Sequence, residues 1–186
     1  MQTIKNLFPK IYDFENLLEA YKAAIKSKRY RPDVMEYADK LEENLFDLQN
    51  NLIWGLYEVG HYHMFYVYEP KKRLIMSLQF KDRVAQHAIY RQLNPLIEKQ
   101  YIKDSYACRV GYGTHAAIER LQGWMRQTER KPEKYYYLKL DVSKYFYRID
   151  HEILKSILAR QIKDKQLLDL LAKIIDCEDT RFGLPM

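Results

Sequence analysis

One carboxylate in the sequence stands where a bound metal ion would be favoured. Asp141 ends the run "YYYLKLD", whose aromatic and apolar residues are typical of a buried strand. An ionised carboxylate at the end of such a strand carries a desolvation cost unless a cation pairs with it. Mg²⁺ suits this position, because it takes one or two carboxylates and completes its shell with water and substrate phosphates. A carboxylate at this place is what metal-assisted phosphoryl transfer needs, whereas the pattern alone favours the alternative, an aspartate that caps the turn after the strand.

A basic segment and many aromatic rings indicate a polyanionic partner. The stretch from Lys71 to Arg83 holds five basic side chains against the single carboxylate of Asp82. The chain of 186 residues carries a formal net charge of +6, and its 17 Tyr, 7 Phe and 2 Trp offer flat surfaces on which bases can stack. The ordinary alternatives are solvated lysines and core aromatics.

A hairpin and several helices have to position these residues. Apolar residues at helical spacing predict helices over residues 13–27, 34–52, 82–99 and 114–128, followed by two short helices at the end. Segment 61–78 predicts two strands joined by a turn at Glu69-Pro70. Asp13 and Asp150 each precede a predicted helix and are the expected N-caps.

The cysteines and the hydropathy pattern narrow the class of protein. Cys108 and Cys177 are far apart and have no CxxC partner, which indicates a reducing compartment. No leader peptide and no run of roughly 20 apolar residues is visible, so we expect a cytoplasmic protein that does not enter a membrane. His61 and His63 could begin a zinc site, but no third and fourth ligand follows at useful spacing.

The wider pattern resembles a known family. The stretch "LKLDVSKYFYRIDHEIL" is similar to the first catalytic motif of reverse transcriptases, most closely those of bacterial retroelements such as group II introns, retrons and diversity-generating elements. Upstream, "EPKKRLIMSLQFKDRVAQ" and "SYACRVGYGTHAAIERL" resemble the fingers blocks of that family in the same order, and the final "GLPM" is similar to the opening of the next palm motif. The resemblance covers residues 62–186, and the N-terminal helices resemble the extension of bacterial members less specifically.

The resemblance implies roles for residues around an incoming nucleotide. Asp141 would hold both magnesium ions, with manganese as the alternative metal, and the backbone carbonyl of Val142 would add a ligand. Phe146 matches the bulky residue beneath the sugar, where an aromatic ring excludes a 2′-hydroxyl; the alternative is a core aromatic. Arg73 matches the fingers arginine that grips the triphosphate, assisted by Lys72 or the lysine before it.

The resemblance also implies contacts with the template strand. Arg109 matches the family position that lies against the template, and Gly111 and Gly113 would let the backbone approach it closely. Arg83 begins a predicted helix, and we expect it to serve structure by pairing with a neighbouring carboxylate.

The sequence departs from the family pattern at two places. Tyr147 stands where many members have an acidic residue, which indicates a distinct subfamily. The sequence stops at Met186, within the motif that begins "GLPM", and nothing in it resembles the later motif with paired aspartates or the thumb. We therefore expect half a catalytic site, which is inactive alone. A shortened fragment, a broken reading frame and a split enzyme completed by a C-terminal half or an oligomeric partner all remain open.

The sequence thus predicts an α+β fold, the fingers and partial palm of a right-hand polymerase. The expected parts are an N-terminal helical extension over 1–60, fingers over 61–134 and the beginning of a palm over 135–186. The expected function is RNA-directed DNA polymerisation, with an RNA template, a DNA primer and deoxynucleotide triphosphates as partners. The alternative is a non-catalytic RNA- or DNA-binding module derived from a reverse transcriptase.

Overall fold

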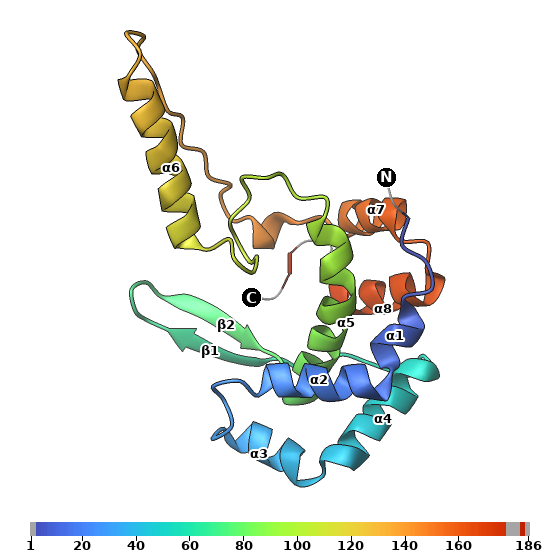
Figure 1. The fold of residues 1–186 in the computed structure, drawn as a ribbon. Coiled ribbons are helices and arrows are strands. Elements are labelled where there is room, and N and C mark those ends of the chain that lie inside the picture. Colours follow the sequence, from blue (N-terminus) through green and yellow to red (C-terminus); the bar gives the residue numbers. More distant parts are fainter. Residues whose placement is uncertain (1–2, 178–182, 185–186) are drawn as a thin grey trace. The chain divides into compact units, whose positions relative to one another are not determined.

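The computed structural model describes residues 3–177 and 183–184 and contains both helices and a small sheet (Figure 1). The chain divides into two compact units, one of residues 1–94 and 144–186 and the other of residues 95–143. The fold is therefore mixed α and β, as predicted, while the predicted fingers and palm boundaries stay a prediction. No helix within the described residues is both long and apolar enough to cross a membrane.

Four helices begin the first unit. They are α1 (Phe8–Tyr12), α2 (Phe14–Ala24), α3 (Pro32–Asp39) and α4 (Leu41–Ile53). The predicted single helix over 34–52 is wrong in one respect, because Lys40 has non-helical backbone angles and separates α3 from α4. The side-chain amide of Asn44 donates to the carbonyl of Tyr37 at 2.9 Å and satisfies an acceptor that the interrupted helix leaves open.

The predicted hairpin is confirmed. Strand β1 (His63–Val67) pairs antiparallel with β2 (Arg73–Ser77), in a register that places His63 opposite Ser77 and Val67 opposite Arg73. Helix α5 (Phe80–Glu98) follows and contains Pro95 near its end.

Two helices close the first unit after the short 3₁₀ turn η1 (Phe146–Arg148). They are α7 (His151–Gln161) and α8 (Lys165–Ile175), and both were predicted. Asp150 caps α7 as expected, because its Oδ1 accepts from the amide of Ile153 at 3.1 Å. Asp13 is the N-cap residue of α2, as expected, but its side chain accepts no cap bond.

Asp164 ties the two ends of this unit together. Its carboxylate accepts from the amide of Leu167 at 3.2 Å, where α8 begins. The same carboxylate accepts from the amides of Leu7 and Phe8 at 2.7 and 2.8 Å, where α1 begins. One acidic side chain therefore satisfies the open amides of two helices that are far apart in the sequence.

A buried carboxylate fixes the start of α5. Asp82 is 0% exposed and accepts from the Tyr57 hydroxyl at 2.9 Å and from the Gly60 amide at 3.1 Å. Burial, and then the neighbouring carboxylate, raise the pKa of Tyr57 above its ordinary value, so the phenol remains a donor. The segment before the hairpin is held to α5 by these two bonds.

We expect Asp82→Ala to lower the free energy of unfolding by about 3 kcal/mol, because two donors would be left in a buried place without their acceptor. Urea unfolding of the two chains measures the difference. Asp169→Ala is the matched control, since Asp169 is exposed on α8 and should change stability by less than about 0.5 kcal/mol. Equal, small losses in both variants would show that the Asp82 bonds contribute little.

The second unit contains α6 (Thr114–Glu129) and segment 135–143, which forms no regular secondary structure. The prediction of a buried strand here is wrong for the described structure. Residues 135–143 pair with no other described strand, and Tyr137 is 94% exposed. A β-rich sequence becomes a strand only when another strand satisfies its amides and carbonyls, and no described segment does so.

Candidate functional site

The hairpin presents basic and aromatic side chains together. The Lys72 ammonium lies 4.5 Å from the centroid of the Tyr66 ring and 5.9 Å from that of Tyr68, within the range of cation–π attraction. The large apolar and aromatic side chains of this strand and turn are exposed: Met64, Phe65, Tyr66, Val67 and Tyr68. Flat rings beside lysines are typical of surfaces on which nucleotides stack.

Arg73 and Arg83 differ in what they contact. Arg73 begins β2, is exposed, and makes no side-chain hydrogen bond or ion pair with the described residues. In contrast, the Arg83 guanidinium donates to the Ser77 hydroxyl at 2.6 Å and more weakly to the Leu78 carbonyl at 3.4 Å. The expectation that Arg83 serves structure is confirmed, although its partners are not carboxylates. Arg73 keeps its guanidinium available for a ligand.

A groove of about 1590 Å³ lies within the first unit, lined by the segment after α2, by the hairpin and by α5. Its lysines and arginines are Lys28, Arg31, Lys40, Lys81 and Arg83. Among the described residues that line the groove, only Asp33 and Glu36 oppose them with negative charge. The sequence did not predict that Lys28, Arg31 and Lys40 contribute to a basic surface. They are separated along the chain and come together only in the folded unit.

Asp141 lies in the exposed segment 135–143. Its charge therefore carries no desolvation cost from a buried strand in this structure. Asp141 accepts no hydrogen bond from the described residues, so the turn-cap alternative has no support from them either. Its carboxylate and the carbonyl of Val142 are oxygen donors of the kind that Mg²⁺ takes, but they make up only part of a shell. Among the described residues, no three His, Cys, Asp or Glu gather to complete one.

Phe146 begins η1 and is 45% exposed, which argues against the alternative of a core aromatic. Its ring packs edge-on against that of Tyr145, with centroids 5.2 Å apart. The ring is therefore supported on one side by a neighbour and still has surface to offer a ligand.

Arg109 organises a loop of the second unit. Its guanidinium stacks 3.8 Å from the Tyr112 ring centroid, donates to the Ser105 carbonyl at 2.9 Å and lies 3.4 Å from the Glu98 carboxylate. The Arg109 side chain is only 8% exposed. A side chain with these partners shapes the loop, and its contact with a template stays a prediction.

The two glycines after Arg109 leave the loop backbone open. Gly111 has φ +79°, in the left-handed region, whereas Gly113 is extended. Apart from the adjoining residues, no described atom lies within 4 Å of where a Cβ would stand at either glycine. The backbone of this loop is therefore accessible to a ligand.

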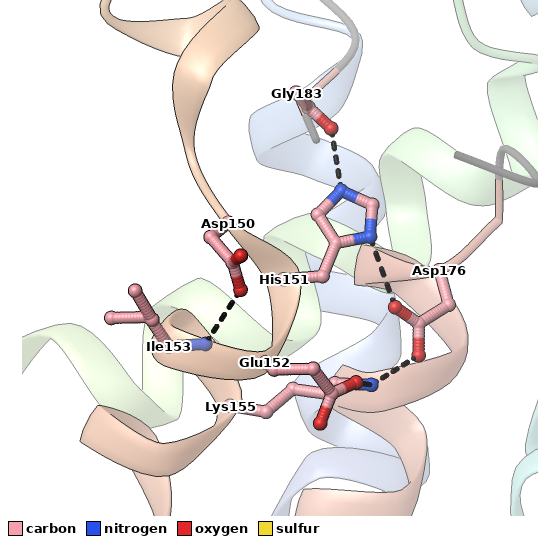
Figure 2. A network of polar contacts seen from close by, with 7 residues as sticks. All are labelled: Asp150, His151, Glu152, Ile153, Lys155, Asp176 and Gly183. Atoms are coloured by element: carbon pink, nitrogen blue, oxygen red, sulfur yellow. Dashed lines mark hydrogen bonds and ion pairs between the residues drawn. The ribbon is translucent and has the colours of Figure 1, made fainter. Parts of the chain in front are cut away.

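Figure 2 shows a polar network that the sequence did not reveal. Asp150 caps α7, and the next residue, His151, bonds to Asp176 and to Gly183. Lys155 bonds to both Glu152 and Asp176. These partners come from α7, the end of α8 and the "GLPM" stretch, of which Pro185 and Met186 lie outside the described residues.

The predicted site residues are divided between the two units. The first unit holds Lys72, Arg73 and Phe146, and the second holds Arg109, Gly111, Gly113, Asp141 and Val142. Each group is described within its own unit, and the joint site stays a prediction.

Comparison with known proteins gives a distant relation to an intron maturase. No protein-family model matches the chain. The chain is 26% identical over 146 residues to Nuclear intron maturase 2, mitochondrial, of Arabidopsis thaliana, a match that takes in 69% of this chain and 19% of the relative. The chain therefore corresponds to about a fifth of that protein's length. It is similar to part of an intron maturase.

Proposed function

We propose that this chain forms the fingers and the first part of the palm of an RNA-directed DNA polymerase of retroelement type. The observation that carries the proposal is the exposed hairpin, on which Arg73 is free of partners within the described residues and Lys72 lies over Tyr66. The order of the sequence motifs and the likeness to an intron maturase support the same class of protein.

Each proposed residue has a distinct task in the reaction. The primer 3′-hydroxyl attacks the α-phosphate of a deoxynucleotide, a new phosphodiester bond forms and pyrophosphate leaves. Arg73 holds the triphosphate by paired hydrogen bonds, and Lys72 adds positive charge. Asp141 and the Val142 carbonyl would hold Mg²⁺, which when bound neutralises charge on the phosphates. Among the described residues, no group of three His, Cys, Asp or Glu side chains gathers to complete the shell.

The basic groove would serve the nucleic acid. Phosphates are attracted by lysines and arginines regardless of base sequence, so the groove would hold a strand without selecting its sequence. Its net positive lining and the exposed rings of the hairpin together fit an RNA strand or a primer–template duplex.

Nucleotide binding tests this proposal. A fluorescent deoxynucleotide titrated into the polypeptide that contains this chain should bind more tightly with Mg²⁺ than with EDTA, and Arg73→Ala should weaken that binding. Binding that is indifferent to both the metal and Arg73 would contradict the proposed nucleotide site.

Phe146→Ala should admit ribonucleotides. Removal of the ring opens the space that a 2′-hydroxyl needs, so the ratio of ribonucleotide to deoxynucleotide incorporation should rise by about tenfold or more. Single-nucleotide primer extension with each substrate measures the two efficiencies, and Tyr145→Ala controls for loss of the neighbouring ring. An unchanged ratio would place Phe146 outside the sugar site.

A second candidate function is favoured by the likeness to an intron maturase. In this reading the chain binds intron RNA through the same groove and hairpin and performs no polymerisation. RNA affinity would then depend on Lys72 and Arg73 but would not depend on Asp141 or Phe146. Binding titrations of these variants separate the two functions.

A further inference from the structure

His151 is a buried side chain that makes two directed bonds. It is 2% exposed, its Nε2 lies 2.7 Å from the Gly183 carbonyl oxygen, and its Nδ1 lies 3.0 Å from Oδ1 of Asp176. Both partner atoms are oxygens, one at each nitrogen of the ring, and the tautomer decides which ring nitrogen donates. Such a ring is fixed in orientation by both ends.

Asp176 is itself held in place. Its Oδ2 accepts from the Lys155 ammonium at 2.8 Å, and Lys155 also contacts the Glu152 carboxylate at 2.6 Å. The bond from Lys155, aided by the one from His151, holds the pKa of Asp176 below its ordinary value. The carboxylate that orients the ring is therefore charged at neutral pH and anchored to α7 (Figure 2).

Nε2 of His151 bonds to Gly183, and residues 183–184 in turn lie against η1, the turn that carries Phe146. The amide of Leu184 donates to the Phe146 carbonyl at 2.9 Å, and the amide of Gly183 donates to the Ile149 carbonyl at 2.9 Å. Gly183 has φ +97°, and a Cβ on it would stand 3.4 Å from Cα of Tyr147. The two segments lie backbone against backbone, joined by two hydrogen bonds, with the bond from His151 as a third attachment.

We propose that His151 is a positioning residue that clamps residues 183–184 onto the backbone of η1 and so sets the position of the Phe146 ring. A three-residue 3₁₀ turn has little stability of its own, so outside bonds to its carbonyls decide its conformation. The effect on nucleotide selection rests on the proposed function, because it requires Phe146 to lie beneath the sugar. The clamp itself does not.

Two substitutions separate the bonds of His151. Glutamine places its side-chain amide nitrogen near the position of Nε2 and can still donate to Gly183. Asparagine places its amide nitrogen near that of Nδ1 and can donate to Asp176, but it does not reach Gly183. His151→Gln is therefore the conservative control for His151→Asn.

Amide hydrogen exchange on the 186-residue chain tests the clamp. We expect the Gly183 and Leu184 amides to exchange about tenfold faster in His151→Asn, in line with the loss of one hydrogen bond, and to stay near the native rate in His151→Gln. Unchanged exchange of the Leu170 amide within α8 shows that the unit remains folded. If the amides of residues 183 and 184 exchange at the same rate in His151→Asn as in His151→Gln, the proposal is overturned.

Nucleotide selection tests the consequence for Phe146. In the polymerase that contains this chain, His151→Asn should raise the ribonucleotide to deoxynucleotide ratio severalfold, and His151→Gln should preserve it, because a purely structural loss would lower both efficiencies alike. A raised exchange rate with an unchanged ratio would overturn the positioning role. If the native protein does not polymerise, the proposed function fails, and the exchange comparison still decides whether the clamp exists.

Discussion

Asp141→Asn is expected to remove nearly all polymerisation from the polypeptide that contains this chain. The amide keeps the shape of the side chain and loses the negative charge that a magnesium ion requires. We expect a fall on the order of a thousandfold, as for other groups that stabilise charge in a transition state. Rates of primer extension measure it, with Asp169→Asn on the exposed face of α8 as a charge-matched control.

The same substitution should leave the 186-residue chain as stable as before. Asp141 is exposed and accepts no bond from the described residues, so the free energy of unfolding should change by less than about 0.5 kcal/mol with or without Mg²⁺. Urea unfolding checks this. A loss of about 1 kcal/mol that ignores the metal would instead identify Asp141 as a turn cap.

Charge reversal of Lys71, Lys72 and Arg73 to glutamate should abolish most binding of RNA or of a primer–template duplex. These exposed side chains would act mainly on phosphates, so affinity should fall at least about tenfold near 0.1 M salt, and the salt dependence should become shallower by roughly two in logarithmic slope. Filter-binding titrations over a range of salt concentrations measure both quantities.

A control with the same change in net charge is available in this chain. Lys5, Lys10 and Lys165 are exposed and lie outside the hairpin and the groove. Their combined reversal to glutamate should alter affinity much less than the hairpin variant does. Equal losses would mean that net charge, and no particular surface, governs binding.

Local patterns predicted most elements of the fold. The helices over 14–24, 80–98 and 114–129 and the hairpin follow from periodicity and turn residues close in sequence. The break at Lys40 and the missing strand at 135–143 could not be predicted in this way. The first involves a side-chain bond from Asn44, and the second depends on whether another strand is present to pair with it.

Only part of the candidate site could be predicted from the sequence, because some of its contacts form only in the folded chain. Arg73 and Phe146 could be chosen by their place in motifs, and the structure leaves both accessible. Arg109 was chosen in the same way, yet its stacking on Tyr112 depends on the folded loop. The bond of His151 joins residues 32 positions apart, so sequence spacing gave no signal for it.

The central claim is that this chain is part of an RNA-directed DNA polymerase. Primer extension on an RNA template of mixed sequence, by the polypeptide that contains this chain, tests it most directly. The account predicts a DNA product that is complementary to the template and that requires Mg²⁺ and all four deoxynucleotides. A polypeptide that binds the primer–template firmly and incorporates no nucleotide under these conditions would contradict it.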